Sequence, residues 1–330
     1  MSTLLKKILI VLLPLIVMLA AYLAFDPFEV VYTYKTHYND PKINYNWDYN
    51  QTETLINNYD KRRYDSFIFG NSRSKAFLTG DWGRYIKSDN CLHYAAMAET
   101  LYGIDKKIKF MDKHAIHIEN CLLVLDAPLL AVTTNSTGHL FIKHPGISGE
   151  SMVDFQLNFF RSFIEPNFFL TYMYYKITGK VPPVSKKKFI IGEMYFNPVT
   201  GDLLQTGTEK QIKENATKFY ADTKTFYPRD FTKKTYTSPV IKSPQLDYLR
   251  EIKRIFAAHK TNYKVIITPN YDMNYLSRED VARLREMFGA NNVYDYSGIN
   301  EYTRDIHNYY ESSHFRPDVA RRILAEIYSR

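Results

Sequence analysis

The sequence predicts an α/β protein in which a mostly parallel, five-stranded sheet is covered by helices on both faces. Two observations support this prediction. Short apolar runs, typical of buried strands, alternate with amphipathic helical segments before residue 128 and again after residue 243. The chain of 330 residues, with 45% hydrophobic and 24% charged side chains, is also long and apolar enough to bury a large core.

The regular elements follow one another in order along the chain. In the first part we expect the strand Ser66–Phe69, the strand Leu92–Met97, a helix over about Glu99–His117, and the strand Cys121–Leu125. In the last part we expect a helix capped by Ser243, the strand Lys264–Thr268, a helix from Ser277 to about Phe288, the strand Asn292–Tyr296, and a final helix from about Pro317.

The N-terminus carries the longest apolar run. Residues Ile8–Phe25 contain no charge, and Lys6 and Lys7 precede them. Eighteen such residues can just span a bilayer, and the preceding lysines place the N-terminus in the cytoplasm. We therefore expect a single-pass membrane anchor over residues 1–25, with the rest of the chain outside the cytoplasm. A cleaved signal peptide is the alternative.

Two segments lie outside the regular pattern. Residues 26–60 predict a stalk that leads into the α/β domain, 61–330. Within this domain, residues 128–243 are rich in Phe, Tyr, Pro and Thr and predict a large insertion or lid. The aromatic content of 15% fits core packing, with sugar-stacking platforms as the alternative.

Composition limits the partners and cofactors. Although the net charge is +8, Lys186–Lys188 is the one basic block, so we expect no nucleic-acid partner. Cys91 and Cys121 lack metal-site spacing and are expected to be buried free thiols, with a disulfide as the alternative. His139 and His144 lie in the insertion without a third ligand at a recognisable spacing, so we expect no metal and no cofactor.

Two motifs carry residues suited to nucleophilic catalysis. Ser72 follows the first strand, at the edge of the sheet where ligands bind in such folds. Glu311 precedes His314 by three residues, just before the final helix. Such a carboxylate can accept the Nδ1–H of the imidazole and leave Nε2 to take a proton from a serine. A helix cap at Ser72 and a structural hydrogen bond at His314 are the alternatives.

These motifs resemble those of the SGNH (GDSL-like) hydrolases. Gly70-Asn71-Ser72 corresponds to the first block, G-D-S at the end of a strand, and Glu311-Ser312-Ser313-His314 to the last block, D-x-x-H. The resemblance covers about residues 61–127 and 244–330 and implies a three-layer, flavodoxin-like fold. With its N-terminal span, the chain looks most like the membrane-anchored branch, which includes alginate O-acetylation proteins and the teichoic-acid D-alanyl transfer protein.

The resemblance also implies further site residues. Ala98 stands where the family has a glycine whose N–H binds the oxyanion, and Asp126 stands where the family has an asparagine donor. Asp126 could instead cap the strand end or bond the loop around Ser72. Arg73 is either a solvated first-turn residue or a group that binds an acyl or carboxylate group, and His144 could line the site from the insertion.

The function implied by the resemblance is O-acyl transfer. An acyl group, acetyl in the first instance, would pass through Ser72 to a hydroxyl of a cell-envelope or exported polysaccharide or glycolipid, and water as acceptor would make the protein an esterase. The expected partners are an acyl donor, this acceptor and a multi-pass membrane O-acyltransferase. The alternative is a catalytically inactive binding or scaffold partner of such an acyltransferase or of a polysaccharide export system.

Overall fold

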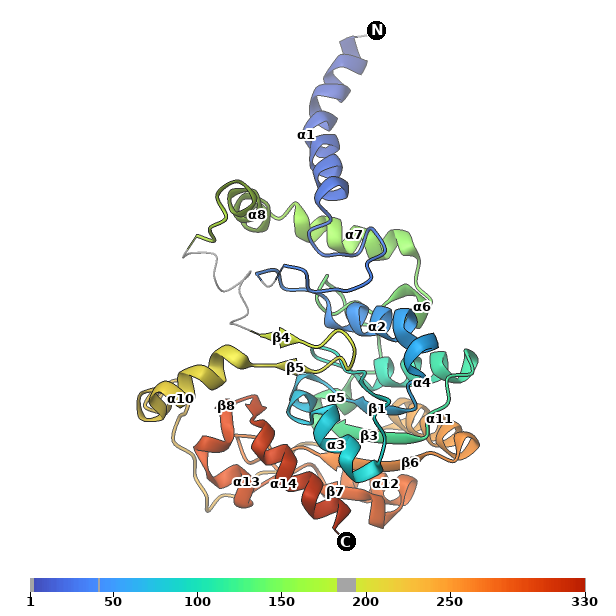
Figure 1. The fold of residues 1–330 in the computed structure, drawn as a ribbon, viewed down its shortest axis with the longest axis vertical. Coiled ribbons are helices and arrows are strands. Elements are labelled where there is room, and N and C mark those ends of the chain that lie inside the picture. Colours follow the sequence, from blue (N-terminus) through green and yellow to red (C-terminus); the bar gives the residue numbers. More distant parts are fainter. Residues whose placement is uncertain (1–2, 41, 183–193, 330) are drawn as a thin grey trace.

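A five-stranded parallel sheet forms the centre of the computed structural model, which describes residues 3–40, 42–182 and 194–329. Its strands stand in the order β2-β1-β3-β6-β7, of which Figure 1 labels β1, β3, β6 and β7. They are β1 (Ser66–Phe69), β2 (Cys91–His93), β3 (Asn120–Leu125), β6 (Asn262–Ile267) and β7 (Val293–Asp295). The predicted α/β class with a mostly parallel five-stranded sheet is confirmed.

The strand order places a switch in direction beside β1. The chain passes from β1 to β2 on one side and then returns to β3 on the other side. Because ligands in open α/β sheets bind where the connections diverge in this way, the segments that follow β1 and β3 occupy the favoured position for a site. Ser72 lies three residues after the end of β1, and Asp126 directly follows β3.

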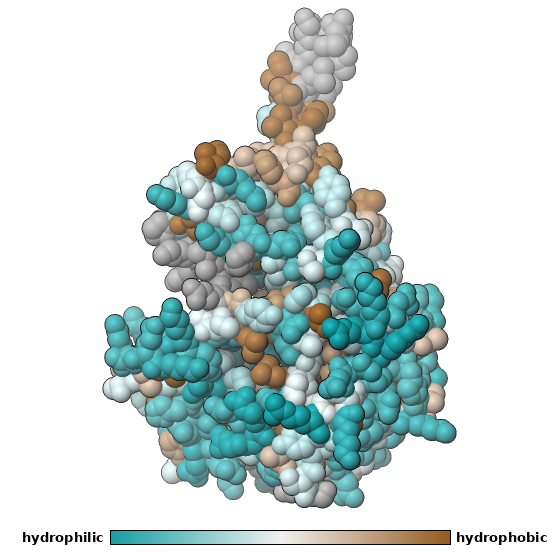
Figure 2. All heavy atoms as spheres, in the orientation of Figure 1, coloured by the Kyte–Doolittle hydropathy of each residue, from teal (hydrophilic) through white to brown (hydrophobic). Residues whose placement is uncertain are grey.

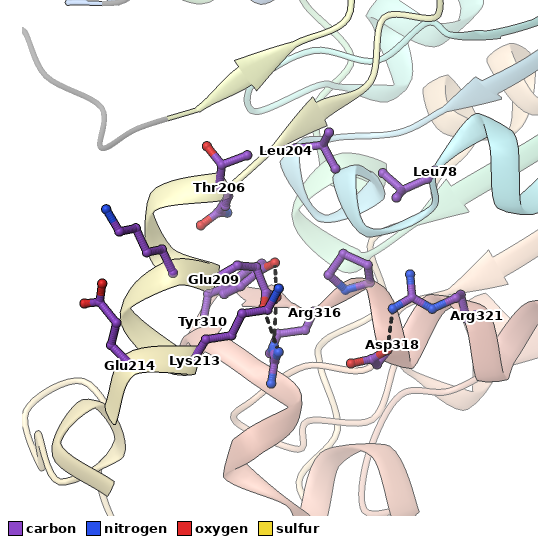
Figure 3. A pocket seen from close by; sticks show the side chains of 13 residues that line it. Leu78, Leu204, Thr206, Glu209, Lys213, Glu214, Tyr310, Arg316, Asp318 and Arg321 are labelled. Carbon is purple, nitrogen blue, oxygen red and sulfur yellow. Dashed lines mark hydrogen bonds and ion pairs between the residues drawn. The ribbon is translucent and has the colours of Figure 1, made fainter. Parts of the chain in front are cut away.

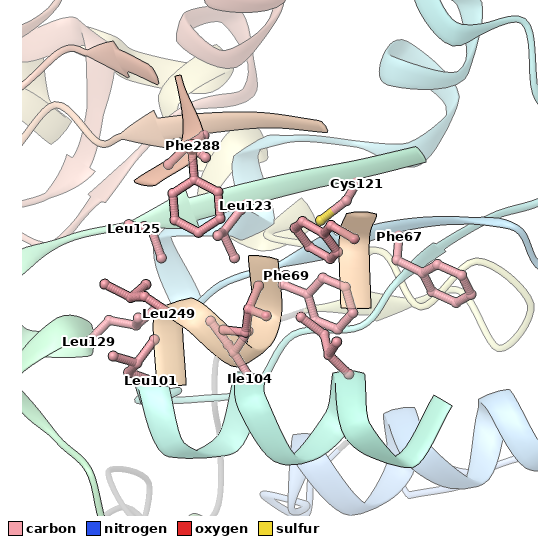
Figure 4. Packing of buried hydrophobic residues seen from close by; sticks show 14 of the residues in the cluster. Phe67, Phe69, Leu101, Ile104, Cys121, Leu123, Leu125, Leu129, Leu249 and Phe288 are labelled. Carbon is pink, nitrogen blue, oxygen red and sulfur yellow. The ribbon is translucent and has the colours of Figure 1, made fainter. Parts of the chain in front are cut away.

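Helices cover both faces of the sheet. Alternation along β1 sends Phe67 and Phe69 to one face and Ile68 to the other. Phe67 and Phe69 pack in the larger core cluster, which Figure 4 shows, with side chains from the adjoining strands and helices. The helices of this face are α4 (Leu101–Lys113), α11 (Ser243–His259) and α12 (Arg278–Phe288); the other face carries α3 (Thr79–Ile86) and α14 (Pro317–Tyr328).

Most predicted boundaries agree with the structure to within two or three residues, but β2 is shorter than expected. It ends at His93 instead of continuing to Met97, because the chain turns there: the Ala96 N–H donates to the Gly70 carbonyl, and Ala98 has a φ of 46°. Helix α11 begins at Ser243 itself, and Lys242 occupies the cap position. Cys91 and Cys121 are buried and unpaired.

Helix α1 (Thr3–Phe25) covers the segment predicted as the anchor and projects from the rest of the chain (Figure 1). Apolar atoms gather along its described part, whereas the visible face below it is largely hydrophilic (Figure 2). At its lower end Tyr22 is buried against Phe160 and Phe163. Among the residues that the structure describes, no helix is both long enough and apolar enough to cross a membrane, so the predicted spanning helix is not confirmed.

The segment predicted as a stalk packs against the predicted insertion. It contains α2 (Trp47–Arg62), whose Leu55 reaches the main core. Aromatic side chains from residues 26–60 form a separate cluster with those of α7 (Met152–Phe163) and α8 (Pro166–Thr178). Many aromatic residues of the insertion therefore pack a core, as the first interpretation expected. The basic block Lys186–Lys188 lies outside the described residues.

The remaining elements of the insertion lie between β3 and α11. They are α5 (Ala127–Ala131), α6 (Pro145–Ser148), the antiparallel pair β4 (Tyr195–Phe196) and β5 (Leu203–Leu204), and α10 (Thr206–Tyr220). A turn at residues 198–200 connects β4 to β5. This hairpin and α10 bring the insertion beside the C-terminal part of the chain (Figure 1).

A buried ionic cluster connects α2, α4 and the insertion. Lys107 Nζ lies 2.8 Å from Asp48 and 2.6 Å from Glu99, and Lys143 Nζ lies 2.9 Å from Asp48 and 2.5 Å from Glu99. All four side chains are almost fully buried. Burial alone would raise the pKa of Asp48, but the two ammonium groups outweigh it and hold that pKa low. The cluster is electrically balanced, with two cations and two anions.

Candidate active site

The turn that carries Ser72 is built by the two residues before it. After β1, the Asn71 Oδ1 accepts the Arg73 N–H at 3.0 Å and so caps the short 3₁₀ helix η1 (Ser72–Ala76). Gly70 is required for close packing, because a Cβ there would lie 2.8 Å from Ser74 Cβ and 2.9 Å from the Val124 carbonyl oxygen. The turn leaves the Ser72 side chain half-buried at the end of β1.

The structure brings Ser72, His314 and Glu311 together. His314 Nε2 lies 2.7 Å from Ser72 Oγ, although the two residues are 242 positions apart. Glu311 and His314 belong to a short antiparallel hairpin formed by β8 (Tyr309–Glu311) and β9 (His314–Phe315). The His314 Nδ1 bonds the Glu311 carboxylate, whose second oxygen accepts the Ser313 N–H at 2.7 Å. The three side chains thus form a serine–histidine–carboxylate chain.

The charges around this chain suit proton transfer from the serine. Burial lowers the pKa of His314, and the nearby cations Lys75 and Arg73 lower it further, against the opposing effect of Glu311. Burial would raise the pKa of Glu311, but its hydrogen bond to His314 and its other partners outweigh burial and lower it. The imidazole is therefore held neutral beside an ionised carboxylate, and a neutral imidazole is the form that accepts a proton.

Arg73 and Asp126 form an ion pair behind the nucleophile. Arg73 Nη1 lies 2.6 Å from Asp126 Oδ2, and Arg73 Nε donates to the Ser313 carbonyl at 3.0 Å. Asp126 also accepts from the Asn71 side chain and caps α5 through the Leu129 N–H. Asp126 therefore acts as a cap and as a partner of the Ser72 turn, and Arg73 joins that turn to the loop before His314.

The other predicted site residues lie in different surroundings. His144 caps α6, bonds Glu53 at 3.0 Å and stacks on Tyr49, so it belongs to the contact between α2 and the insertion. His139 packs against Phe28, and burial lowers its pKa to about 4. Neither has a contact with Ser72 or His314 among the described residues. Within those residues no three His, Cys, Asp or Glu side chains gather as metal ligands.

Ala98 is exposed in the loop after β2 and has the positive φ that favours glycine. This left-handed conformation is compatible with the glycine that the resemblance to the SGNH hydrolases implies at that position. The hydrogen bond from Ala96 to Gly70 holds the start of this loop against the Ser72 turn. No hydrogen bond of the Ala98 N–H is found among the described residues.

A second serine–histidine–carboxylate chain, which the sequence did not predict, lies buried behind the first. His93 Nε2 lies 2.9 Å from Ser74 Oγ, and His93 Nδ1 lies 3.3 Å from Asp202 Oδ1. Asp202 also accepts from the Thr79 hydroxyl at 2.6 Å. Because Ser74 and His93 are fully buried, no substrate reaches them. This chain connects η1 to the β4–β5 hairpin, and a histidine at the end of a strand was its one sequence signal.

A groove adjoins the Ser72 site. It has a volume of about 730 Å³ and lies between α10 and the start of α14 (Figure 3). Glu209 of α10 bridges its two walls, because its carboxylate pairs with Arg316 at 2.8 Å and accepts from the Tyr310 hydroxyl at 2.7 Å. The groove shares Leu204, Gln205, Tyr310 and Pro317 with a small cavity of about 10 Å³ at Ser72 and His314.

Comparisons with known proteins give no relative for this chain. No protein-family model, no curated protein and no solved structure matches it. The chemistry of the site is therefore argued from its geometry. A half-buried serine beside a neutral imidazole and an ionised carboxylate can form and release a covalent acyl intermediate.

Proposed function

We propose that this chain is a serine-dependent acyl-ester enzyme of the SGNH type, acting as an O-acyltransferase or an esterase. The observation that carries the proposal is the 2.7 Å contact between Ser72 Oγ and His314 Nε2, with Glu311 bonded to the other ring nitrogen. The strand order, with β1 between β2 and β3 and helices on both faces, supports the flavodoxin-like arrangement that this proposal includes.

The proposed reaction has two steps. Ser72 Oγ attacks the carbonyl carbon of an acyl ester while its proton moves to His314 Nε2; collapse of the tetrahedral adduct breaks the ester bond and returns that proton to the leaving alcohol. In the second step an acceptor hydroxyl gives its proton to His314 and attacks the acyl-serine. The proton then passes to Ser72 Oγ and restores the resting enzyme. Water as acceptor gives hydrolysis by the same path.

The groove beside Ser72 supports a hydroxyl-rich acceptor. Its walls carry charged and hydrogen-bonding side chains from α10 and α14 (Figure 3). Tyr310 lines both this groove and the cavity at His314. Such a surface suits a sugar chain better than an aliphatic one. A polysaccharide or glycolipid acceptor therefore remains part of the proposal, with acetyl as the acyl group. The proposal names no cofactor and no nucleic-acid partner.

The oxyanion of the tetrahedral adduct needs donors. The N–H groups of Ser72 and Ala98 are the proposed pair. Asp126 would repel such a charge if it were alone, but its ion pair with Arg73 neutralises it. This pairing supports activity at a position where the family resemblance implies an asparagine.

Attachment to a membrane, an extracytoplasmic location and work beside a multi-pass acyltransferase are also proposals. Exposed apolar side chains on α1, including Ile10, Leu13 and Val17, support attachment through this helix. Recovery of the full-length chain in the soluble fraction of cells, without detergent, would contradict the attachment.

A second candidate function is a binding or scaffold role without chemistry. The small size of the cavity at Ser72, about 10 Å³, favours it, because that volume holds about one water-sized group. The two functions differ in whether Ser72 reacts.

The deciding experiment is covalent labelling of the full-length protein with a fluorophosphonate probe, together with hydrolysis of p-nitrophenyl acetate. We expect labelling and turnover in the wild type, loss of both in Ser72→Ala, and no change in Ser329→Ala, which removes an exposed hydroxyl near the C-terminus. An unlabelled wild type, or a Ser72→Ala variant that labels like the wild type, would exclude the acyl-enzyme and leave the scaffold function.

A further inference from the structure

Lys75 lies on the same side of η1 as the nucleophile. It follows Ser72 by three residues in a 3₁₀ helix, and side chains three apart eclipse one another in that geometry. Ser72, Lys75, His314 and Tyr310 line the same cavity of about 10 Å³. A single lysine in a first helical turn is ordinarily a solvated side chain, so the sequence alone predicts no role for Lys75.

Among the described residues, the ammonium of Lys75 takes part in no ion pair. In the described part of the chain, no carboxylate lies within ion-pair distance of it. The other cation on η1, Arg73, is paired with Asp126. Lys75 therefore brings a positive charge without a directly paired carboxylate to a half-buried cavity, beside a histidine whose charge decides whether the serine can react.

The charged groups in this cavity and in the groove beside it come from five elements, the first being η1 with Lys75. His314 of β9 lines the cavity with Lys75, and Glu311 of β8 bonds the His314 imidazole. Glu209 of α10 forms an ion pair with Arg316, and Asp318 of α14 forms one with Arg321. With these pairs satisfied, the local charge is that of Lys75 and Glu311, which cancel while His314 is neutral. Protonation of His314 would leave a net positive charge in a site with little water.

We propose that Lys75 is a positioning residue that acts through His314: its ammonium opposes protonation of the imidazole and keeps Glu311 ionised on Nδ1. The base is then ready for the Ser72 proton at a pH where an ordinary histidine would be charged. The inference deepens the proposed acyl-ester function, and its catalytic meaning rests on that function. The charge relation among the three side chains can be measured whether or not the protein is an enzyme.

The electrostatics agree with this role. Burial lowers the pKa of Lys75 to about 8, against the opposing pull of Glu311, and the charge of Lys75 lowers the pKa of both Glu311 and His314. Lys75 thus carries its charge below about pH 8 and loses it above. Its influence on His314 is present over the range in which a histidine titrates.

The first test is the titration of His314 itself, followed by NMR on full-length protein with ¹³C-labelled histidine. The chain has 9 histidines, and a His314→Gln variant assigns the resonance. Lys75→Met removes the charge, so the imidazolium becomes easier to form and the pKa of His314 should rise. Lys75→Arg keeps the charge and should leave the low pKa in place. Lys75→Gln serves as a second neutral variant if Lys75→Met does not fold.

The matched control is Lys113→Met. Lys113 is an exposed lysine at the end of α4 that leads toward the start of β3, at the opposite edge of the sheet from Ser72. Its removal changes the net charge equally and should not move the His314 titration. A neutral Lys75 variant with the wild-type titration, or an equal shift in the Lys113 control, would overturn the proposal.

The second test is the pH dependence of ester hydrolysis. At pH 6 we expect kcat/KM of Lys75→Met to fall about 3–10-fold relative to wild type, with less than about a twofold change on the plateau near pH 7.5. Lys75→Arg should match the wild type at pH 6, and a uniform loss at every pH in Lys75→Met would contradict the role. Absent fluorophosphonate labelling of the wild type would reject the acyl-ester function alone, because the NMR titration still decides the role of Lys75.

Discussion

Replacing Arg73 by methionine tests whether the two halves of the site are held together by one side chain. The guanidinium donates to Asp126 at 2.6 Å on the β3 side and to the Ser313 carbonyl at 3.0 Å on the hairpin that carries His314. Methionine keeps much of the side-chain bulk and removes both bonds. The variant should lose stability, and the loop before His314 should loosen.

The magnitude follows from the surroundings of the pair. Breaking a buried ion pair costs about 3–5 kcal/mol. Arg73 is 21% exposed, and Asp126 keeps its bonds to Asn71 and Leu129, so we place the loss in the free energy of unfolding at about 3 kcal/mol. For 330 residues unfolding as one unit, the entropy of unfolding is about 0.7 kcal/mol/K, which converts this loss to about 4 °C in Tm.

The assay is a thermal melt followed by near-ultraviolet circular dichroism, with ester hydrolysis measured on the same samples. Arg84→Met is the matched control, because Arg84 is 81% exposed and its ion pair to Asp81 is 4.0 Å long, so Tm should change by less than 1 °C. If Arg73→Met melts within 1 °C of Arg84→Met, the ion pair does not hold the site together and the reasoning fails.

Two further substitutions test the packing around the site. Gly70→Ala should lower the free energy of unfolding by about 1–3 kcal/mol and reduce ester hydrolysis, because its Cβ would lie less than 3 Å from atoms of Ser74 and Val124. The control Gly80→Ala places its Cβ in open space and should be neutral or slightly stabilising. Equal melting temperatures for the two variants would refute the steric argument. Asp48→Asn leaves two buried lysines facing one carboxylate and should lower the free energy of unfolding in urea by about 3–5 kcal/mol. In the control Asp60→Asn the replaced side chain is 96% exposed, so its loss should cost almost nothing. Similar urea midpoints for the two variants would contradict the importance of the buried cluster.

The parts of the fold that the sequence predicted are those with a local pattern. Ser66–Phe69 and Cys121–Leu125 are short apolar runs at the sheet centre, and Ser277 and Pro317 mark helix starts by well-known cap and first-turn preferences. Each of these depends on neighbours within a few residues. Their prediction therefore needed no knowledge of the tertiary structure.

In the candidate site, too, the sequence predicted the local interactions and not those that depend on tertiary structure. The spacing of Glu311 and His314 predicted their hydrogen bond, because three residues on a tight loop decide it. The β8–β9 hairpin around them has no recognisable pattern in the sequence, since strands of two and three residues have too few positions for alternation. Asp126 was left with several roles, and its pairing with Arg73 depends on two strands lying side by side.

The interactions that the sequence did not predict join distant segments. His93 and Asp202 are 109 positions apart, and Asp202 stands in a segment without a regular pattern. The buried cluster of Asp48 and its partners likewise draws on three separate regions. Polar side chains in such positions look like ordinary surface residues until the fold brings them together.

The packing of residues 26–60 against the insertion fixes how far the Ser72 site lies from helix α1. If residues 26–60 were a flexible spacer, the distance between the Ser72 pocket and the N-terminal helix would vary widely. Here Tyr22 is fixed on α7, and Asp48 on α2 is tied by salt links to Lys107 of α4, beside the central sheet. The distance from the lower end of α1 to the nucleophile is therefore set by rigid packing. An acceptor must reach Ser72 at this fixed distance from α1 to be modified.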